Sequence, residues 1–110
     1  MSDFKYKKDP GNKTLESFGA IAYECRACAI DHGFPLHDKL PQLVAFMSEV
    51  GEWAEAIRKD DKDNELEEIV DVMVRIFAYA EEHFPSDWKR ALVQKMQYNR
   101  LRPFKHGKEF

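Results

Sequence analysis

The sequence predicts an all-α fold, a single four-helix bundle that we expect to assemble as a homo-oligomer. Apolar residues recur at helical spacing in several segments, and Pro and Gly residues separate these segments. No stretch shows the alternation of apolar and polar residues that is typical of strands. With 110 residues the chain can form one core and little more, so a site shared between subunits is plausible.

The first two helices are marked by Pro and Gly residues at their ends. We expect one helix over residues 15–31, where Thr14 can cap the start and Gly33 precedes a loop. A second is expected over residues 41–59, because Pro41 suits a first helical turn. Its apolar residues recur at helical spacing: Leu43, Phe46, Met47, Val50, Ala54 and Ile57.

Two more helices are expected over residues 65–83 and 87–101. Asp63 or Asn64 can cap the third helix and Pro85 follows its end, while Ser86 can cap the fourth. The short link between the second and third helices implies an antiparallel pair. We expect residues 1–110 to form one domain, with a loose arm over residues 1–13 and a basic tail over residues 103–110.

Composition indicates a globular protein whose charge is unevenly distributed. Hydrophobic residues make up 44% and charged residues 34%, with a net charge of −3. No apolar run could span a membrane and no secretion signal is visible, so we expect a cytoplasmic protein without a membrane partner. Residues 49–71 include ten acidic and three basic residues, whereas residues 89–110 include seven basic residues and one acidic residue. A magnesium-bound polyphosphate needs both kinds of surface.

Four carboxylates are the strongest candidates for chemistry. Glu49 and Glu52 share one face of the second helix, and Glu68 and Asp71 share one face of the third. If these helices are antiparallel neighbours, the two pairs can face each other, and their repulsion calls for a cation. Oxygen ligands suit magnesium, which also binds phosphate oxygens.

The same acids also have a plainer interpretation as solvated helix faces. Glu55 with Lys59, and Asp71 with Arg75, could form simple ion pairs one turn apart. Spacing alone leaves both interpretations open.

Other site types receive weaker support. Cys25 and Cys28 form a C-x-x-C motif that His32 and His37 could complete as a zinc site, but we expect reduced, buried thiols that pack the first helix. The basic tail could bind nucleic acid, although the chain is acidic elsewhere and we consider nucleic acid an unlikely partner.

Three motifs together resemble a known family. The segments SEVGE (residues 48–52), EEIVD (67–71) and KMQYNRLRP (95–103) occur in this order. They are similar to the EExxE, ExxD and KxxxNR…P elements of the MazG-like all-alpha NTP pyrophosphatases. The resemblance covers roughly residues 36–108.

The resemblance implies hydrolysis of an NTP or dNTP to the monophosphate and pyrophosphate, with Mg²⁺ as cofactor and Mn²⁺ as a possible substitute. It also implies a homodimer or homotetramer that shares active sites, and a role in nucleotide pool clean-up or control. Carried over by position, the metal ligands are Glu49, Glu52, Glu68 and Asp71, and the phosphate-binding residues are Lys95, Asn99 and Arg102. We further expect Glu52 or Glu49 to be catalytic, by orienting the attacking water or taking its proton. The candidate nucleoside-binding residues are Trp53, because it adjoins the acids, and Arg75, one turn beyond Asp71.

Two positions depart from the family pattern. Ser48 replaces the first Glu of EExxE, and Arg75 stands where an aromatic or apolar residue is expected near the nucleoside. Arg75 could pair with Asp71, touch phosphate or read a base. The alternative function is a non-catalytic helical module that binds nucleotide or another protein.

Overall fold

The computed structural model describes residues 18–102, and this part of the chain contains four helices and no strand. They are α1 (Phe18–Asp31), α2 (Lys39–Arg58), α3 (Lys62–His83) and α4 (Trp88–Leu101). The predicted all-α class and the four helices are therefore confirmed. Thr14, the predicted N-terminal arm and the predicted basic tail lie outside the described residues.

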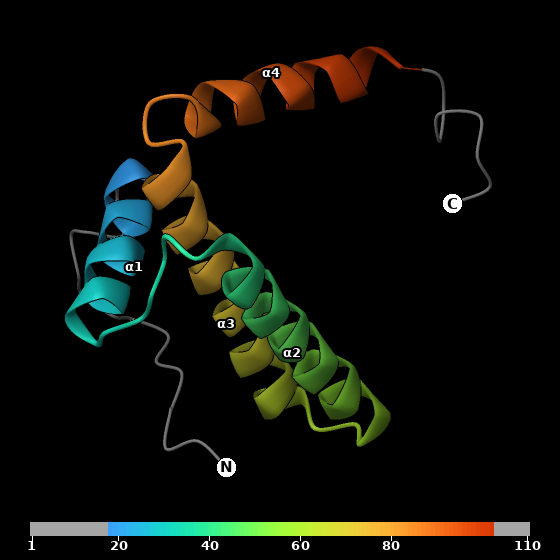
Figure 1. The fold of residues 1–110 in the computed structure, drawn as a ribbon. Helices are drawn as coiled ribbons and strands as arrows, with labels where there is room; N and C mark the ends of the chain where they lie inside the picture. Colours follow the sequence, from blue (N-terminus) through green and yellow to red (C-terminus); the bar gives the residue numbers. More distant parts are fainter. Residues whose placement is uncertain (1–17, 103–110) are drawn as a thin grey trace.

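The α2–α3 hairpin contains the two longest of the described helices, which run antiparallel, as expected (Figure 1). The turn between them places Asp60 at a positive φ of 53°, while the Asp61 amide donates to the Ala56 carbonyl oxygen at 3.1 Å. Asp61 then caps α3, because its side chain accepts from the Asn64 amide at 3.1 Å. The cap is thus Asp61 rather than Asp63 or Asn64, and α3 begins three residues earlier than predicted.

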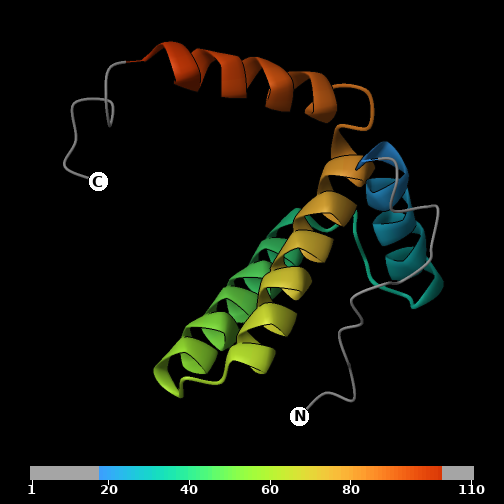
Figure 2. The same cartoon turned by 180° about the vertical axis from the view of Figure 1, so that it is seen from behind.

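Helix α1 packs beside the half of α3 that lies farther from the hairpin turn, as both ribbon views show (Figure 2). Ala22 in α1 and Ala78 in α3 are buried, because small side chains let the helices approach closely. An ion pair between Arg26 Nε and Glu82 Oε1 at 2.9 Å also joins the two helices. This arrangement leaves a space between α1 and the hairpin, where the candidate site lies.

Helix α4 departs from the predicted bundle, because it extends away from the other three helices (Figure 1). Its attachment is Trp88, whose ring packs on Phe18 and Phe77 at centroid distances of 5.4 and 5.8 Å. Trp88 Nε1 also donates to Glu81 Oε1 at 2.7 Å. Every residue from 89 to 101 is exposed. In one chain, therefore, three helices pack together and the fourth does not complete the bundle.

Large apolar side chains remain exposed on the hairpin and on α4. A groove of about 280 Å³ on the hairpin is lined by Leu40, Leu43, Phe46, Ile76 and Tyr79, among others. Leu40 is 74% exposed, and the apolar residues of α4 are exposed as well: Leu92, Val93, Met96 and Leu101. None of the described helices is long and apolar enough to cross a membrane.

Candidate metal centre

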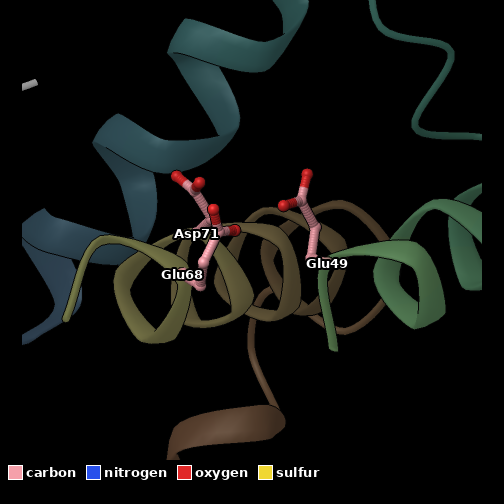
Figure 3. A group of neighbouring side chains, drawn as sticks. All are labelled: Glu49, Glu68 and Asp71. Atoms are coloured by element: carbon pink, nitrogen blue, oxygen red, sulfur yellow. The ribbon is translucent and has the colours of Figure 1, made fainter. Parts of the chain in front are cut away.

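Three of the four predicted carboxylates converge on one point. Glu49 extends from α2, and Glu68 and Asp71 extend from α3. One oxygen from each lies within 4.8 Å of the others. The three side chains point the same way, toward α1 (Figure 3). The antiparallel hairpin thus brings the two acidic helix faces together, as their spacing predicts.

Glu68 is the most buried member of this cluster. It is only 9% exposed, and its Oε2 is buried with no hydrogen-bond partner. Burial, the nearby Glu52 carboxyl and the charges of Asp71 and Glu49 together raise the pKa of Glu68 to about 7. A buried carboxylate oxygen without a partner is costly, and either protonation of Glu68 or a bound cation would lower that cost.

The two neighbouring acids, Glu49 and Asp71, also have raised pKa values. Burial is the main cause that raises the pKa of both Glu49 and Asp71, although Arg75 acts in the opposite direction on each. Glu52 contributes to the raised pKa of Glu49, Glu68 and Asp71. Glu52 itself is exposed and does not belong to the convergent group. The four predicted carboxylates therefore form one electrostatic unit, with Glu52 at its solvent-facing margin.

This donor set fits a hard divalent cation. The convergent atoms are all carboxylate oxygens, which are the ligands that magnesium and manganese accept. A cation would satisfy the orphaned Glu68 oxygen and relieve the repulsion among the acids. Among the described residues, no other group of three or more potential ligands converges in this way.

Arg75 makes a contact that spacing did not predict. Its Nε donates to Glu49 Oε1 at 3.2 Å, across the hairpin, and Asp71 one turn before it is not its hydrogen-bonded partner. The guanidinium carbon also lies 5.3 Å from the ring centroid of Phe34. Arg75 thus links the acidic cluster to the loop between α1 and α2.

A cavity of about 210 Å³ opens beside the cluster, between α1 and the hairpin. Its lining combines three charged side chains with eight uncharged ones: Glu49, Asp71 and Arg75, then Cys25, Cys28, Ala29, Phe34, Leu36, Gln42, Val74 and Ala78. Because two metal-ligand candidates also line the cavity, a ligand held at the cluster can extend into it.

The remaining predicted site residues lie elsewhere in this single chain. Trp53 donates from Nε1 to Glu65 Oε2 at 3.0 Å and does not line the cavity. Lys95, Asn99 and Arg102 belong to α4 and its end, which stand away from the hairpin. Lys95 Nζ lies 4.8 Å from the Tyr98 ring centroid, and the Arg102 guanidinium carbon lies 5.4 Å from it. The structure therefore does not bring the predicted phosphate-binding residues to the carboxylates.

Sequence reasoning missed part of the cavity wall. Phe34 and Gln42 belong to no motif, and the folded chain alone places them beside the acids. Cys25 and Cys28 are free thiols that line the same cavity. Cys28 is exposed, so the expectation of two buried thiols is wrong for this residue. Burial and the neighbouring Cys28 raise the pKa of the Cys25 thiol.

Comparison with known proteins adds no relative: no family model matches the chain, and no curated protein or solved structure is similar to it. The family resemblance therefore rests on the three sequence motifs.

Proposed function

We propose that this chain is a MazG-like nucleoside triphosphate pyrophosphohydrolase that converts an NTP or dNTP to its monophosphate and pyrophosphate. The single observation that carries the proposal is the buried Glu68 carboxylate, which has an unpartnered oxygen and converges with the carboxylates of Glu49 and Asp71. The three sequence motifs support the same reaction.

Magnesium, or manganese in its place, would be held by Glu49, Glu68 and Asp71, with Glu52 at the margin. Bound there, it would neutralise phosphate charge and acidify a water molecule. The chain's own residues then have distinct tasks. Glu52, the exposed acid, accepts the proton of the attacking water. The water oxygen bonds to the α-phosphorus, the bond to the bridging oxygen breaks, and its electron pair leaves with pyrophosphate.

A second copy of the chain completes this site in our proposal. Lys95 and Asn99 lie one turn apart on α4, and their expected task is to bind phosphate and offset charge on the leaving group. In one chain α4 stands away from the carboxylates, and the proposed source of these residues is therefore another subunit. Basic α4 and the acidic hairpin are complementary in charge.

Exposed apolar surface supports the same assembly. Few large side chains are buried in the described part of one chain, and the groove that contains Leu40, Leu43 and Ile76 is open. Apolar faces of this kind on both the hairpin and α4 match a homodimer or homotetramer interface. Docking α4 of one copy on the hairpin of another would cover both faces together.

The nucleoside would occupy the cavity beside the cluster, near Arg75. Trp53 stays a predicted nucleoside contact, but it does not line this cavity, so it would contact only a nucleoside bound outside it. A cytoplasmic role in nucleotide pool clean-up or control follows from the proposed reaction.

Product analysis tests the function and its main alternative together. Purified protein is incubated with magnesium and each standard and non-standard NTP and dNTP, beside the Glu52→Ala variant, and products are resolved by ion exchange. Monophosphate plus pyrophosphate, lost in the variant, is the expected result. Diphosphate plus phosphate would contradict attack at the α-phosphorus. No turnover, with nucleotide still bound, would favour a non-catalytic binding module.

A further inference from the structure

We propose that Arg75, supported by Phe34 and Glu49, selects a purine base that carries an oxygen at C6, as guanine and hypoxanthine do. The inference rests on the proposed function, because it assumes that a nucleotide is held at the acidic cluster. It goes further by naming the base and the group that reads it.

The position of Arg75 relative to the cluster is the first step. Asp71 and Glu49 line both the convergent acidic group and the cavity, and Arg75 lines the cavity one turn beyond Asp71. A nucleotide whose phosphates lie at the carboxylates therefore directs its nucleoside toward Arg75.

The guanidinium of Arg75 is held from two sides. Its Nε is engaged by Glu49 at 3.2 Å, and Phe34 lies against it at 5.3 Å from ring centroid to guanidinium carbon. The two terminal nitrogens make no hydrogen bond to any residue between 18 and 102. A guanidinium restrained in this way loses little freedom when its remaining N–H groups bind a ligand.

The chemistry of the cavity wall favours a base over a phosphate as that ligand. Apart from Arg75 and the two acids of the cluster, the side chains that line the cavity are uncharged and mostly apolar, including Ala29, Leu36, Val74 and Ala78. Placing charged phosphate oxygens against such a wall costs free energy, whereas the flat apolar faces of a base suit it.

The donor pattern of Arg75 then distinguishes among the bases. A guanidinium donates two parallel hydrogen bonds, and the O6 and N7 atoms of guanine accept them as a pair. Adenine places an amino donor where O6 would be, so donor would face donor. Uracil and thymine offer no such pair of adjacent acceptors, whereas cytosine has one at O2 and N3, so the two-bond match separates guanine and hypoxanthine from adenine within the purines. Guanine and hypoxanthine thus share the matching edge.

Calorimetric binding of monophosphates in the presence of magnesium tests the selection without relying on turnover. The probes are dGMP, dIMP, dAMP and 7-deaza-dGMP, which lacks only the N7 acceptor. Wild-type protein should bind dGMP and dIMP about ten- to a hundredfold more tightly than dAMP, and more tightly than 7-deaza-dGMP. In Arg75→Met the ratio of dGMP to 7-deaza-dGMP affinity should approach one. Arg58→Met, which removes an exposed arginine paired with Glu55, should leave the ratio unchanged.

Each outcome separates this inference from the proposed function. Equal binding of dGMP, dAMP and 7-deaza-dGMP by the wild type would overturn base selection, even if triphosphates are hydrolysed. If the ratio of dGMP to 7-deaza-dGMP affinity were unchanged in Arg75→Met, Arg75 would not read the base. Its role would then be to contact phosphate or to hold Glu49, and the inference would be overturned. Selective binding in a protein that hydrolyses no triphosphate would support the base site and overturn the enzyme.

Discussion

Arg75 donates a hydrogen bond from Nε to Glu49 Oε1 at 3.2 Å, and this contact occupies one oxygen of a candidate metal ligand. Both side chains are largely buried, so the pair is screened less than a surface ion pair. The guanidinium partly neutralises a group of acids that repel one another, as its effect on the pKa of Glu49 and Asp71 shows. Arg75 thus neutralises the same acids that we propose as metal ligands.

Arg75→Met should therefore destabilise the metal-free protein more than the metal-bound protein. We expect a loss of about 1–2 kcal/mol without metal, because Glu49 then lies unpaired beside like charges. Added magnesium should raise the melting temperature of the variant more than that of the wild type. Thermal unfolding measured with and without magnesium tests this, with Arg58→Met as the exposed control. An equal magnesium effect in both proteins would contradict the shared role.

Glu68 predicts a specific dependence of metal-free stability on pH. Its pKa is about 7 in the folded chain against an ordinary value of 4.5, so the folded state holds more protons between these values. The contribution of Glu68 to stability is therefore most favourable below that window and is lost as pH rises through it. Glu68→Gln should raise the melting temperature above about pH 7.5 and change it little near pH 5.

The control for this prediction is Glu55→Gln, because Arg58 lowers the pKa of Glu55 rather than raising it. It should bring no gain in stability at high pH. The prediction would be contradicted if the metal-free stability of the wild type rose between pH 5 and about pH 8 and this rise were absent in Glu68→Gln. A rise of that kind would mean that folding lowers the pKa of Glu68 instead of raising it.

The same proton governs metal affinity. Magnesium needs the ionised Glu68, so affinity measured by calorimetry should fall as pH decreases below about 7, and metal binding should release protons. Glu68→Gln should weaken magnesium binding by tenfold or more above about pH 7, and the difference from the wild type should shrink at lower pH, where Glu68 is protonated. Wild-type affinity that is retained in the variant would exclude Glu68 as a ligand.

The hairpin turn that aligns the acidic faces can be strengthened or weakened at adjacent positions. Asp60 has a φ of 53°, a conformation that glycine adopts more readily, so Asp60→Gly should stabilise the fold by about 0.5–1 kcal/mol. Asp61→Ala should cost about 1 kcal/mol, because the α3 cap is lost. Urea unfolding of both variants measures the two effects, and effects of equal sign would contradict this account of the turn.

Shared active sites can be tested by mixing two inactive variants. Lys95→Ala removes a group on α4 and Glu68→Gln removes one on the hairpin. If each site combines α4 of one copy with the hairpin of another, hybrid oligomers contain some sites with both residues intact. The mixed, refolded sample should regain activity that neither variant has alone. Activity that stays at the level of the separate variants would place both residues in a single chain.

The spacing of residues along the helices predicted the helical elements and the meeting of the acids, but not the contacts that depend on tertiary packing. The facing of Glu49 with Glu68 and Asp71 follows from two i, i+3 pairs on an antiparallel hairpin, so it was predictable. The separation of α4 from the bundle could not be predicted. The apolar residues of α4 have the same helical spacing whether this helix packs against its own chain or against another copy. Phe34 and Gln42 lie beyond sequence reasoning because tertiary packing alone brings them to the acids. The Arg75–Glu49 contact crosses between helices, and spacing within α3 suggested Asp71 instead.

Hydrolysis in water enriched in ¹⁸O tests the central proposal most directly. A nucleoside triphosphate that the protein consumes is incubated with magnesium, and both products are examined by mass spectrometry. The proposed attack on the α-phosphorus predicts one labelled oxygen in the nucleoside monophosphate and none in pyrophosphate. Label in pyrophosphate, label in phosphate released beside a diphosphate, or no product from any nucleotide would contradict it.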